Sequence, residues 1–337
     1  MRKIWLPLPL LLAGFAVIAV RQAEKADTRT PDAGKPPLRV VLALPTQPSN
    51  AGWFVGLDKG YFAEQGVELV NQPHAIGLQA LDAVTRGRAD LALVADTPVM
   101  FAVMRGADLS IVATTYSSRD YMALVARGDR GIARAADLKG KKIGYVPNTS
   151  GHFFLYSLLL ANGLGSGRAM PTVVSPAESV ALIGSGALDA LVSWEPTLSE
   201  ARAAIGPSAV VFRGPELYTV RFSLVGFSSY VSTHPAELKA LLKGLTRANE
   251  FIQQQPEQAR LILAKYLHGP NPAAGAALVP GDYRISLDQG QLITLEDQAR
   301  WALKEDLVPQ QPVPNFLRNM DLTALLAIAP DNVTLVR

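Results

Sequence analysis

Residues Asp137 to Leu155 read DLKGKKIGYVPNTSGHFFL, and this stretch predicts the unit from which the fold is built. Lys141–Tyr145 reads as a short strand, and Val146–Asn148 as a tight turn. From Thr149 to Asn162 the apolar residues recur at helical spacing, which predicts a helix. The chain therefore passes from strand through turn to helix within one short segment.

The start of this expected helix is a candidate ligand site. Thr149 or Ser150 is placed as its N-cap, and Gly151 lets a bound group come close to the backbone. The N–H groups of a first helical turn lack partners within the helix, and the helix dipole favours an anion beside them. A Ser/Thr cap alone is more often structural, so the pattern gains weight only where it recurs along the chain.

The same order of strand, loop and helix occurs upstream. Arg39–Leu44, Val67–Asn71 and Ala89–Val94 are apolar runs of strand length, and Ala51–Lys59 and Leu78–Arg86 have helical composition. This alternation predicts an α/β fold with doubly wound, mainly parallel sheets, whose loops gather at the carboxyl ends of the strands. Ligands of such sheets bind at those ends.

A further helix is expected where the third of these strands ends. Asp96 or Thr97 would be its N-cap, and Pro98 its first helical residue, which is a position that proline favours. This is a second candidate helix start at a strand's carboxyl end.

The chain is long enough for two lobes. It has 337 residues, of which 49% are hydrophobic and 18% charged, as in globular proteins. Tyr121–Ala126 reads as a strand that leaves the first lobe, and Phe222–Phe227 as one that returns to it. We therefore expect lobe 1 to hold residues 38–124 and 224–337, and lobe 2 residues 125–223, with two hinge segments between them. The last part is mostly helical, at Pro235–Gln254, Pro256–Tyr266 and Leu287–Leu303.

The N-terminus reads as an export signal. Residues 1–20 begin with Arg2 and Lys3 and continue as an apolar stretch, which predicts a cleaved signal peptide or, alternatively, an uncleaved signal anchor. Residues 21–37 read as a polar linker. Because the chain has no cysteine, it lacks the residue that a bacterial lipoprotein needs, and we expect a free periplasmic protein.

Composition and motifs argue against nucleic-acid binding and against catalysis. The net charge of +3 is small, and no basic run is interleaved with aromatic residues. There is no HExxH, GxxxxGK[ST] or GxSxG pattern, and the four histidines are spread along the chain. We therefore expect no cofactor, no metal site and no enzymatic activity.

Five segments carry a resemblance to a known family. They are GYFAEQGVEL (60–69), GLQALDAVTRGRADLALV (77–94), ADTPV (95–99), DLKGKKIGYVPNTSGHFFL (137–155) and ALDALVSWEP (187–196). Over about residues 38–258 they resemble the substrate-binding proteins of bacterial ABC importers for nitrate, sulfonate, taurine and related compounds. The resemblance implies a type II periplasmic binding protein, a two-lobed clamp that closes on a ligand and delivers it to a membrane permease with its ATPase. We expect it to act as a monomer.

The resemblance also places a set of residues around one cleft. They are Asn50, Trp53, Gly77, Asp96, Thr97, Tyr116, Ser117, Asn148, Thr149, Ser150, Gly151, His152, Trp194 and Glu195. Helix starts near Asn50, Thr97 and Ser150 would supply N–H donors, which favours an organic oxyanion, with a sulfonate as the leading class.

Several of these residues keep a second interpretation. Trp53 and Trp194 either stack on the ligand or pack locally, and His152 either donates to an anion or is satisfied by near neighbours. Asp96 and Glu195 are cap and turn residues in one interpretation. In the other they hold an amine or a ring N–H, which would suit a nitrogen heterocycle such as a thiamin-precursor pyrimidine.

Two arginines are further candidates. Arg119 and Arg221 could each grip an oxyanion with two N–H groups, although surface or hinge roles are preferred for both.

Two functions of other classes stay open. The resemblance extends to fungal thiamin-pyrimidine synthases, which carry a cysteine-rich motif, and the lack of cysteine disfavours that enzyme. The other alternative is a ligand-sensing domain that acts through a membrane receptor.

Overall fold

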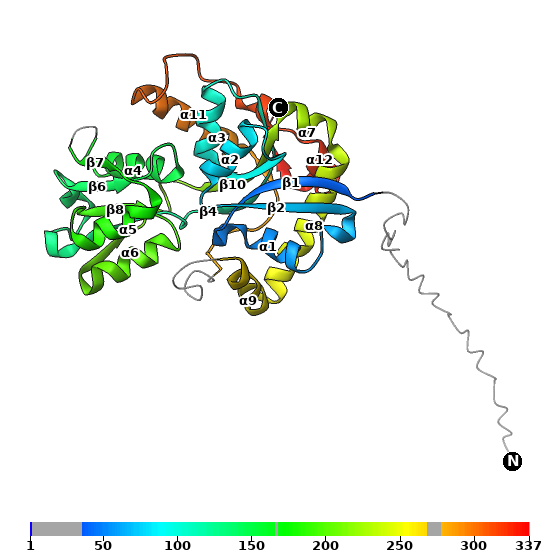
Figure 1. Ribbon diagram of the computed structural model, residues 1–337, viewed down its shortest axis with the longest axis horizontal. Helices are drawn as coiled ribbons and strands as arrows, with labels where there is room; N and C mark the ends of the chain where they lie inside the picture. The colour runs from blue at the N-terminus through cyan, green and yellow to red at the C-terminus, as the bar shows by residue number, and fades with distance from the viewer. Residues whose placement is uncertain (2–35, 166–167, 268–277, 337) are drawn as a thin grey trace. The chain divides into compact units, whose positions relative to one another are not determined.

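The computed structural model describes residue 1 and residues 36–165, 168–267 and 278–336 (Figure 1). Apart from Met1, the expected targeting segment lies outside the described residues, as do residues 21–35 of the linker and His268.

Five strands form the first sheet. In spatial order they are β2 (Val67–His74), β1 (Leu38–Pro45), β3 (Leu91–Ala95), β10 (Val220–Phe227) and β4 (Leu109–Ser118). β1 is parallel to β2 and β3, whereas β10 is antiparallel to both β3 and β4. All of β3 is buried, as expected for a continuous apolar strand that is covered on both faces.

Five more strands form the second sheet. In spatial order they are β7 (Met170–Val173), β6 (Lys142–Tyr145), β8 (Ala190–Ser193), β5 (Ala123–Arg127) and β9 (Ala209–Phe212). β6 is parallel to β7 and β8, and β5 is antiparallel to β8 and β9. In each sheet one strand thus opposes the other four, so both sheets are mixed, with two parallel and two antiparallel neighbouring pairs in each. The expected two-lobed α/β fold is confirmed.

The chain crosses between the sheets twice. β4 belongs to the first sheet and β5 to the second, while β9 belongs to the second and β10 to the first. β5 and β10 are each entered directly from the other sheet, without a helix between, and each runs antiparallel to its neighbours. A helical crossover within one sheet would instead keep successive strands parallel. Because β10 begins at Val220, the boundary expected at residues 223 and 224 falls inside this strand.

The helices lie between and after the strands. They are α1 (Ala51–Asp58), α2 (Gly77–Thr85), α3 (Asp96–Met104), α4 (Ser150–Ala161), α5 (Pro176–Ser185), α6 (Thr197–Ile205), α7 (Ser228–Thr233), α8 (Pro235–Gln254), α9 (Pro256–Tyr266), α11 (Gln289–Lys304) and α12 (Thr323–Leu326). The short β11 (Leu287–Asp288) and β12 (Val333–Thr334) pair with one another.

Three helix starts differ from the sequence-based prediction. α3 begins at Asp96 with Ala95 as its N-cap, because the Asp96 side chain turns inward instead of capping. Thr149 is the N-cap of α4 by backbone geometry, but its Oγ1 donates to Val146 O at 2.7 Å and caps no helical N–H. α11 begins at Gln289 because Asp288 caps it, accepting from the N–H of Gln291 at 2.9 Å.

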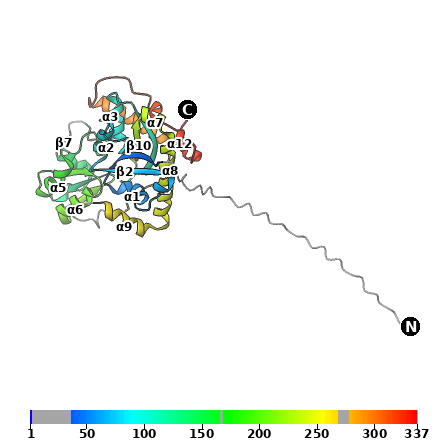
Figure 2. The same cartoon turned by 45° about the vertical axis from the view of Figure 1, so that its right-hand side comes forward.

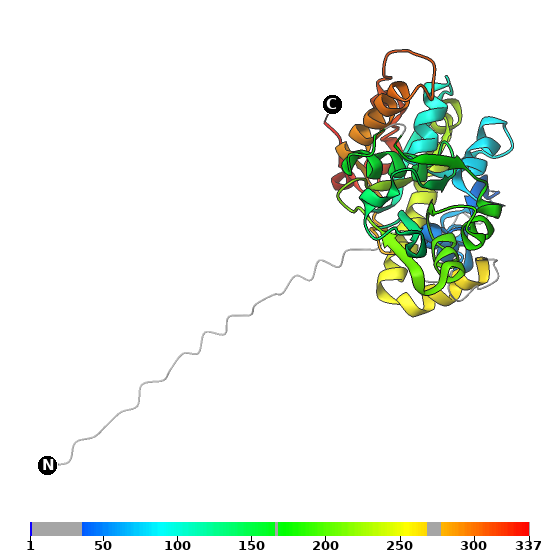
Figure 3. The ribbon, with the colours of Figure 1, turned by 90° about the vertical axis from the view of Figure 1, so that its left-hand side faces the viewer.

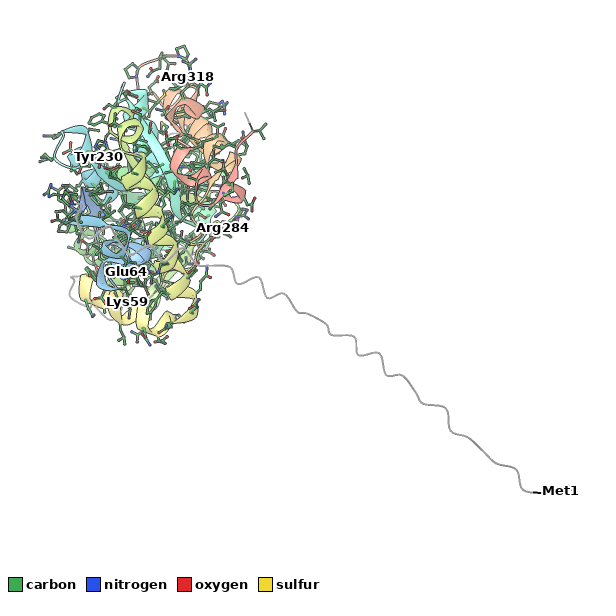
Figure 4. The ribbon with its side chains drawn as sticks, turned by 90° about the vertical axis from the view of Figure 1, so that its right-hand side faces the viewer. Met1, Lys59, Glu64, Tyr230, Arg284 and Arg318 are labelled. Carbon is green, nitrogen blue, oxygen red and sulfur yellow. The ribbon has the colours of Figure 1, made fainter. Side chains whose placement is uncertain are left out.

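The helices of the C-terminal part pack on those of the first sheet. α1 lies against α8 and α9, which Figure 2 shows as the blue and yellow segments. α11 packs on α3, and Figure 3 shows this orange and cyan pair side by side. At the rim of the α1–α8 contact, Lys59 Nζ lies 4.6 Å from the ring centre of Phe251, in the region labelled in Figure 4. α8 and α9 have the predicted limits.

In the described part of the chain, no helix has both the length and the apolar character needed to span a bilayer.

Candidate functional site: a cavity between the two sheets

A cavity lies where the carboxyl ends of strands from both sheets meet. Its lining comes from the loop after β1, the starts of α2, α3 and α4, the segment before β5, strand β10 and the loop after β8. The lining residues are Gln47, Ile76, Gly77, Leu78, Ala95, Pro98, Tyr121, Met122, Thr149, Ser150, Trp194 and Phe222. This is the position at which parallel α/β sheets bind ligands.

The start of α2 presents backbone donors to the cavity. The N–H groups of Gly77 and Leu78 have no acceptor among the described residues. Packing is close at Gly77, where an added Cβ would lie 3.3 Å from Val94 Cα. The absence of a side chain therefore lets the α2 start approach β3 closely.

The start of α4 presents donors from the other sheet. Ser150 N–H has no acceptor in the described part of the chain, and neither has Gly151 N–H in the same turn. Because the Thr149 hydroxyl is turned to Val146 O, it leaves these groups uncapped. Two helix starts from opposite sheets thus face one cavity, and each carries partial positive charge.

The remaining walls are apolar. Trp194, 8% exposed, lies over Gly151, whose added Cβ would come 3.5 Å from Trp194 Cζ3. Tyr121 and Phe222 pack edge to face, with ring centres 4.9 Å apart. The cavity has a volume of about 30 Å³ and no lysine or arginine in its lining. Its polar character therefore comes from backbone and hydroxyl groups and from the side-chain amide of Gln47.

Behind the cavity wall, Asp96 holds the two sheets together through a buried network. Its carboxylate accepts from Thr97 N–H at 2.7 Å and from Gln298 Nε2 at 3.2 Å, and also from the Tyr218 hydroxyl. Arg221 N–H of β10 and Ser150 Oγ of α4 donate to it at 3.2 and 3.4 Å. Most of these donors bind Oδ1, and Arg221 N–H binds Oδ2.

The environment of Asp96 perturbs two titrating groups. Burial raises the pKa of Asp96, although the hydrogen bonds from Tyr218 and Gln298 oppose that shift. Burial and the adjacent Asp96 charge raise the pKa of Tyr218 well above its usual value, so the phenol keeps its proton and donates it. Asp96 is therefore a structural acceptor, and the amine-binding interpretation finds no support in its contacts.

Four predicted site residues lie away from the cavity. Asn50 is fully buried and donates through Nδ2 to Pro45 O at 2.8 Å. Trp53 is 1% exposed and stacks on Phe62 with ring centres 5.5 Å apart, so its expected ligand contact is replaced by core packing. Tyr116 and Ser117 lie instead against the segment after residue 279. The Tyr116 hydroxyl donates to Pro280 O at 2.8 Å. The Ser117 N–H donates to Asp282 O at 2.9 Å.

Three others are close in sequence to lining residues but are not part of the lining. Asn148 has a positive φ of 58° and accepts from Arg105 Nη2 at 3.4 Å across the two sheets. Glu195 accepts from Ser199 N–H at 3.1 Å, which is the cap and turn role that its position favoured. His152 does not line the cavity, and its ring lies 4.5 Å from that of Tyr145.

Only part of the expected donor set is therefore assembled. Of the three predicted helix starts, the one at Ser150 faces the cavity with free N–H groups. Thr97 N–H is taken by Asp96, and Asn50 N–H donates to Gln47 O at 3.0 Å. The α2 start at Gly77 supplies the second set of donors instead.

The two candidate arginines do not line the cavity either. Arg221 pairs with Asp288 at 3.2 Å, and Arg119 is exposed beside the segment that precedes β10. Both line a surface depression together with Tyr218 and Thr294. The structure thus agrees with the surface and hinge roles that were preferred.

Sequence reasoning missed residues whose role depends on distant partners. Gln298 lies in α11 and Tyr218 in the second crossing, yet both reach Asp96. Gln47 and Tyr121 line the cavity from the loops after β1 and before β5. The only local signal for these two was their position at a predicted strand end. Among the described residues, no group of three or more histidine, cysteine or acidic side chains could hold a metal ion.

Comparison with known proteins gives a consistent picture. The family model described as NMT1/THI5 like matches residues 47–259. A relative from Escherichia coli (strain K12) that carries the name of an aliphatic sulfonates-binding protein is 29% identical over 222 residues, covering 66% of this chain and 68% of the relative.

Solved structures share the fold. The periplasmic aliphatic sulphonate binding protein SsuA from Escherichia coli aligns with a TM-score of 0.72 at 23% identity, covering 84% of this chain and 92% of the other. The alkanesulfonate-binding protein SsuA from Xanthomonas axonopodis pv. citri, bound to MOPS, aligns with a TM-score of 0.73 at 20% identity, covering 85% and 99%.

Proposed function

The chain belongs to the NMT1/THI5-like family, and on that premise we propose that it is the substrate-binding component of an ABC importer. Its ligand is a small organic anion, a sulfonate, held between the two sheets. Relatives named for binding aliphatic sulfonates support this ligand class.

The observation that carries the proposal is the pair of facing helix starts. The unpaired N–H groups of Gly77 and Leu78 on one side, and of Ser150 and Gly151 on the other, suit the several oxygens of one sulfonate group. Such donors stabilise an anion without a basic side chain, because they are fixed by the backbone and aligned with the helix dipoles. Trp194 supplies an aromatic face for the ligand's carbon skeleton.

Ligand capture requires the sheets to separate. At about 30 Å³ the cavity is far smaller than a typical small-molecule site, which spans roughly 300–1,000 Å³. The two crossings are the points about which the lobes, residues 38–124 with 224–337 and residues 125–223, open and close by hinge motion. The closed form is then presented to a membrane permease with its ATPase, on the outer side of the cytoplasmic membrane, and the binding protein acts as a monomer.

A thermal-shift screen of the purified protein tests the ligand class. Candidates are alkanesulfonates, taurine, nitrate, aromatic carboxylates and hydroxymethylpyrimidine. A ligand at a hundred times its Kd stabilises the folded state by about 2.7 kcal/mol, which is visible as a raised Tm. Stabilisation by sulfonates supports the proposal, whereas stabilisation only by the pyrimidine or by an amine contradicts it.

Two substitutions at one position then test the donor argument. Ser150→Pro removes the N–H at the first helical residue, where proline is tolerated, and Thr149 already has the extended ψ of 168° that proline requires before it. Ser150→Ala removes only the hydroxyl. Loss of a hydrogen bond to a charged group, roughly 1.5–3 kcal/mol, predicts a Kd ten- to a hundredfold higher for the proline variant. Calorimetry that finds equal Kd values for the two variants would contradict the donor role.

A further inference from the structure

The side chain of Trp301 joins helices of the two lobes. Trp301 lies in α11, which packs on α3, and its ring centre is 5.8 Å from that of Phe101 in α3. Towards the other lobe its ring centre is 4.8 Å from that of His152 and 5.2 Å from that of Phe153, both in α4. The ring centre of Tyr156, one helical turn further along α4, lies 5.7 Å away. We call these five residues the interlobe aromatic cluster.

The cluster includes the first turn of the helix that carries proposed anion donors. His152 and Phe153 directly follow Ser150 and Gly151, whose N–H groups have no acceptor among the described residues. Trp301 is 4% exposed and is not part of the cavity lining. It therefore acts on these donors through its packing on α4 and not by contact with a ligand.

Polar contacts between the same helices are weaker than this packing. In the described part of the chain, three hydrogen bonds join α4 and the turn before it to α3 and α11, and each is 3.3–3.4 Å long. They are Arg105 Nη2 to Asn148 Oδ1, Ser150 Oγ to Asp96 Oδ1, and Lys304 Nζ to the Tyr156 hydroxyl. Such lengths exceed the usual range of roughly 2.5–3.2 Å, whereas aromatic pairs stabilise a contact beyond the area that they bury. Aromatic packing is therefore the main attraction between the lobes on this side of the cavity.

We propose that Trp301 is a positioning residue, which favours the closed form of the two lobes and holds the α4 donors towards the ligand. This inference rests on the function proposed above. When the lobes separate, the Trp301 ring loses its contacts with α4 and enters water, which opposes opening. The apparent affinity rises with the fraction of the free protein that is already closed. Replacement of Trp301 therefore weakens binding although it removes no ligand contact.

The distance between the lobes tests the proposal in the absence of ligand. Because the chain has no cysteine, the double variant Ala203→Cys/Gln258→Cys provides two unique sites for spin labels. Both residues are exposed, Ala203 in α6 and Gln258 in α9, two helices that Figure 1 labels. Pulsed electron–electron double resonance then measures the distribution of distances between the labels.

Substitutions in this labelled protein separate positioning from stability. Trp301→Leu is expected to shift or broaden the distance distribution, and Trp301→Phe, which keeps a ring, to stay closer to wild type. The control Trp53→Leu removes a tryptophan from the core beside the first sheet. It is expected to lower the Tm and to leave the distance distribution unchanged, because a loss of stability alone does not alter the folded form.

Calorimetry with ethanesulfonate as the probe measures the effect on binding. The Kd is expected to be about tenfold higher in Trp301→Leu and within about twofold of wild type in Trp53→Leu. A distance distribution or a Kd that is the same in Trp301→Leu and wild type overturns the proposal. If no alkanesulfonate binds to wild type, the function proposed above fails, and the distance measurement still decides the role of Trp301. If Trp301→Leu does not fold, Tyr156→Ala, at a half-buried residue on the α4 side of the cluster, is judged by the same two measurements.

Discussion

The neutral His152 ring predicts a stability that depends on pH. The ring lies between Tyr145 and Trp301, and burial lowers its pKa to about 4 from the ordinary 6.5. Two charged residues lie in this neighbourhood: Glu305 lines one cavity together with His152, and Lys304 Nζ donates to the Tyr156 hydroxyl at 3.3 Å. His152→Phe keeps a ring in place for both aromatic contacts and removes the titration.

The expected size follows from the difference in pKa between the folded and unfolded states. Between pH 6.5 and 4 the unfolded chain binds a proton at His152 that the folded chain does not bind, so stability rises with pH across this window. Stability is fully present above pH 6.5 and is lost as the pH falls towards 4. At about 1.4 kcal/mol for each pKa unit, the loss amounts to about 3 kcal/mol.

Urea denaturation of wild type and His152→Phe at several pH values between 7.5 and 4 measures this loss. Titrations that the two proteins share, including those of carboxylates, cancel in the difference between their free energies of unfolding. That difference should change by about 3 kcal/mol in favour of the variant as the pH falls. A difference that stays constant with pH would refute the claim that His152 is buried in its neutral form.

Three further tests separate the cavity from its supporting structure. Asp96→Ala leaves several buried donors without an acceptor and should destabilise the protein by about 3–5 kcal/mol in urea denaturation. The control Asp82→Ala breaks an exposed ion pair and should cost less than about 1 kcal/mol. Similar losses of stability in the two variants would argue against the buried network. Trp194→Ala should weaken sulfonate binding at least tenfold in calorimetry. Trp53→Ala should chiefly lower the free energy of unfolding, by about 3–5 kcal/mol. The opposite pattern would reverse the roles assigned to the two tryptophans. Gly77→Ala should weaken binding because its Cβ would push the α2 start away from Val94, and an unchanged Kd would count against donors at this helix start.

Local patterns predicted the elements of this fold well. The limits of α8 and α9 agree with the prediction, since each helix begins with proline at its first position and continues with an amphipathic period. The alternation of apolar strands and helices similarly predicted an α/β fold, but not that both sheets are mixed. These signals are local, because helix capping and periodic burial are determined by residues a few positions apart.

The cavity could be located from the sequence, but most of its lining could not. Trp53 and Trp194 both occur shortly after a strand, yet one stacks in the core and the other lines the cavity. Asp96 was correctly placed at a strand's carboxyl end, but its contacts with Tyr218 and Gln298 join residues more than a hundred positions apart. No local pattern reports such a partner.

The order of strands and helices follows from the sequence alone. Alternating β and α segments favour parallel strands whose loops gather at one edge of the sheet. The sequence therefore also indicates the edge at which a ligand binds. Only the tertiary structure decided which loop residues turn towards the other sheet. A period of apolar residues shows that a side chain is buried but not what buries it. For that reason the helix starts at Gly77 and Ser150, rather than those near Asn50 and Thr97, could be recognised as the free pair only once both sheets were in place.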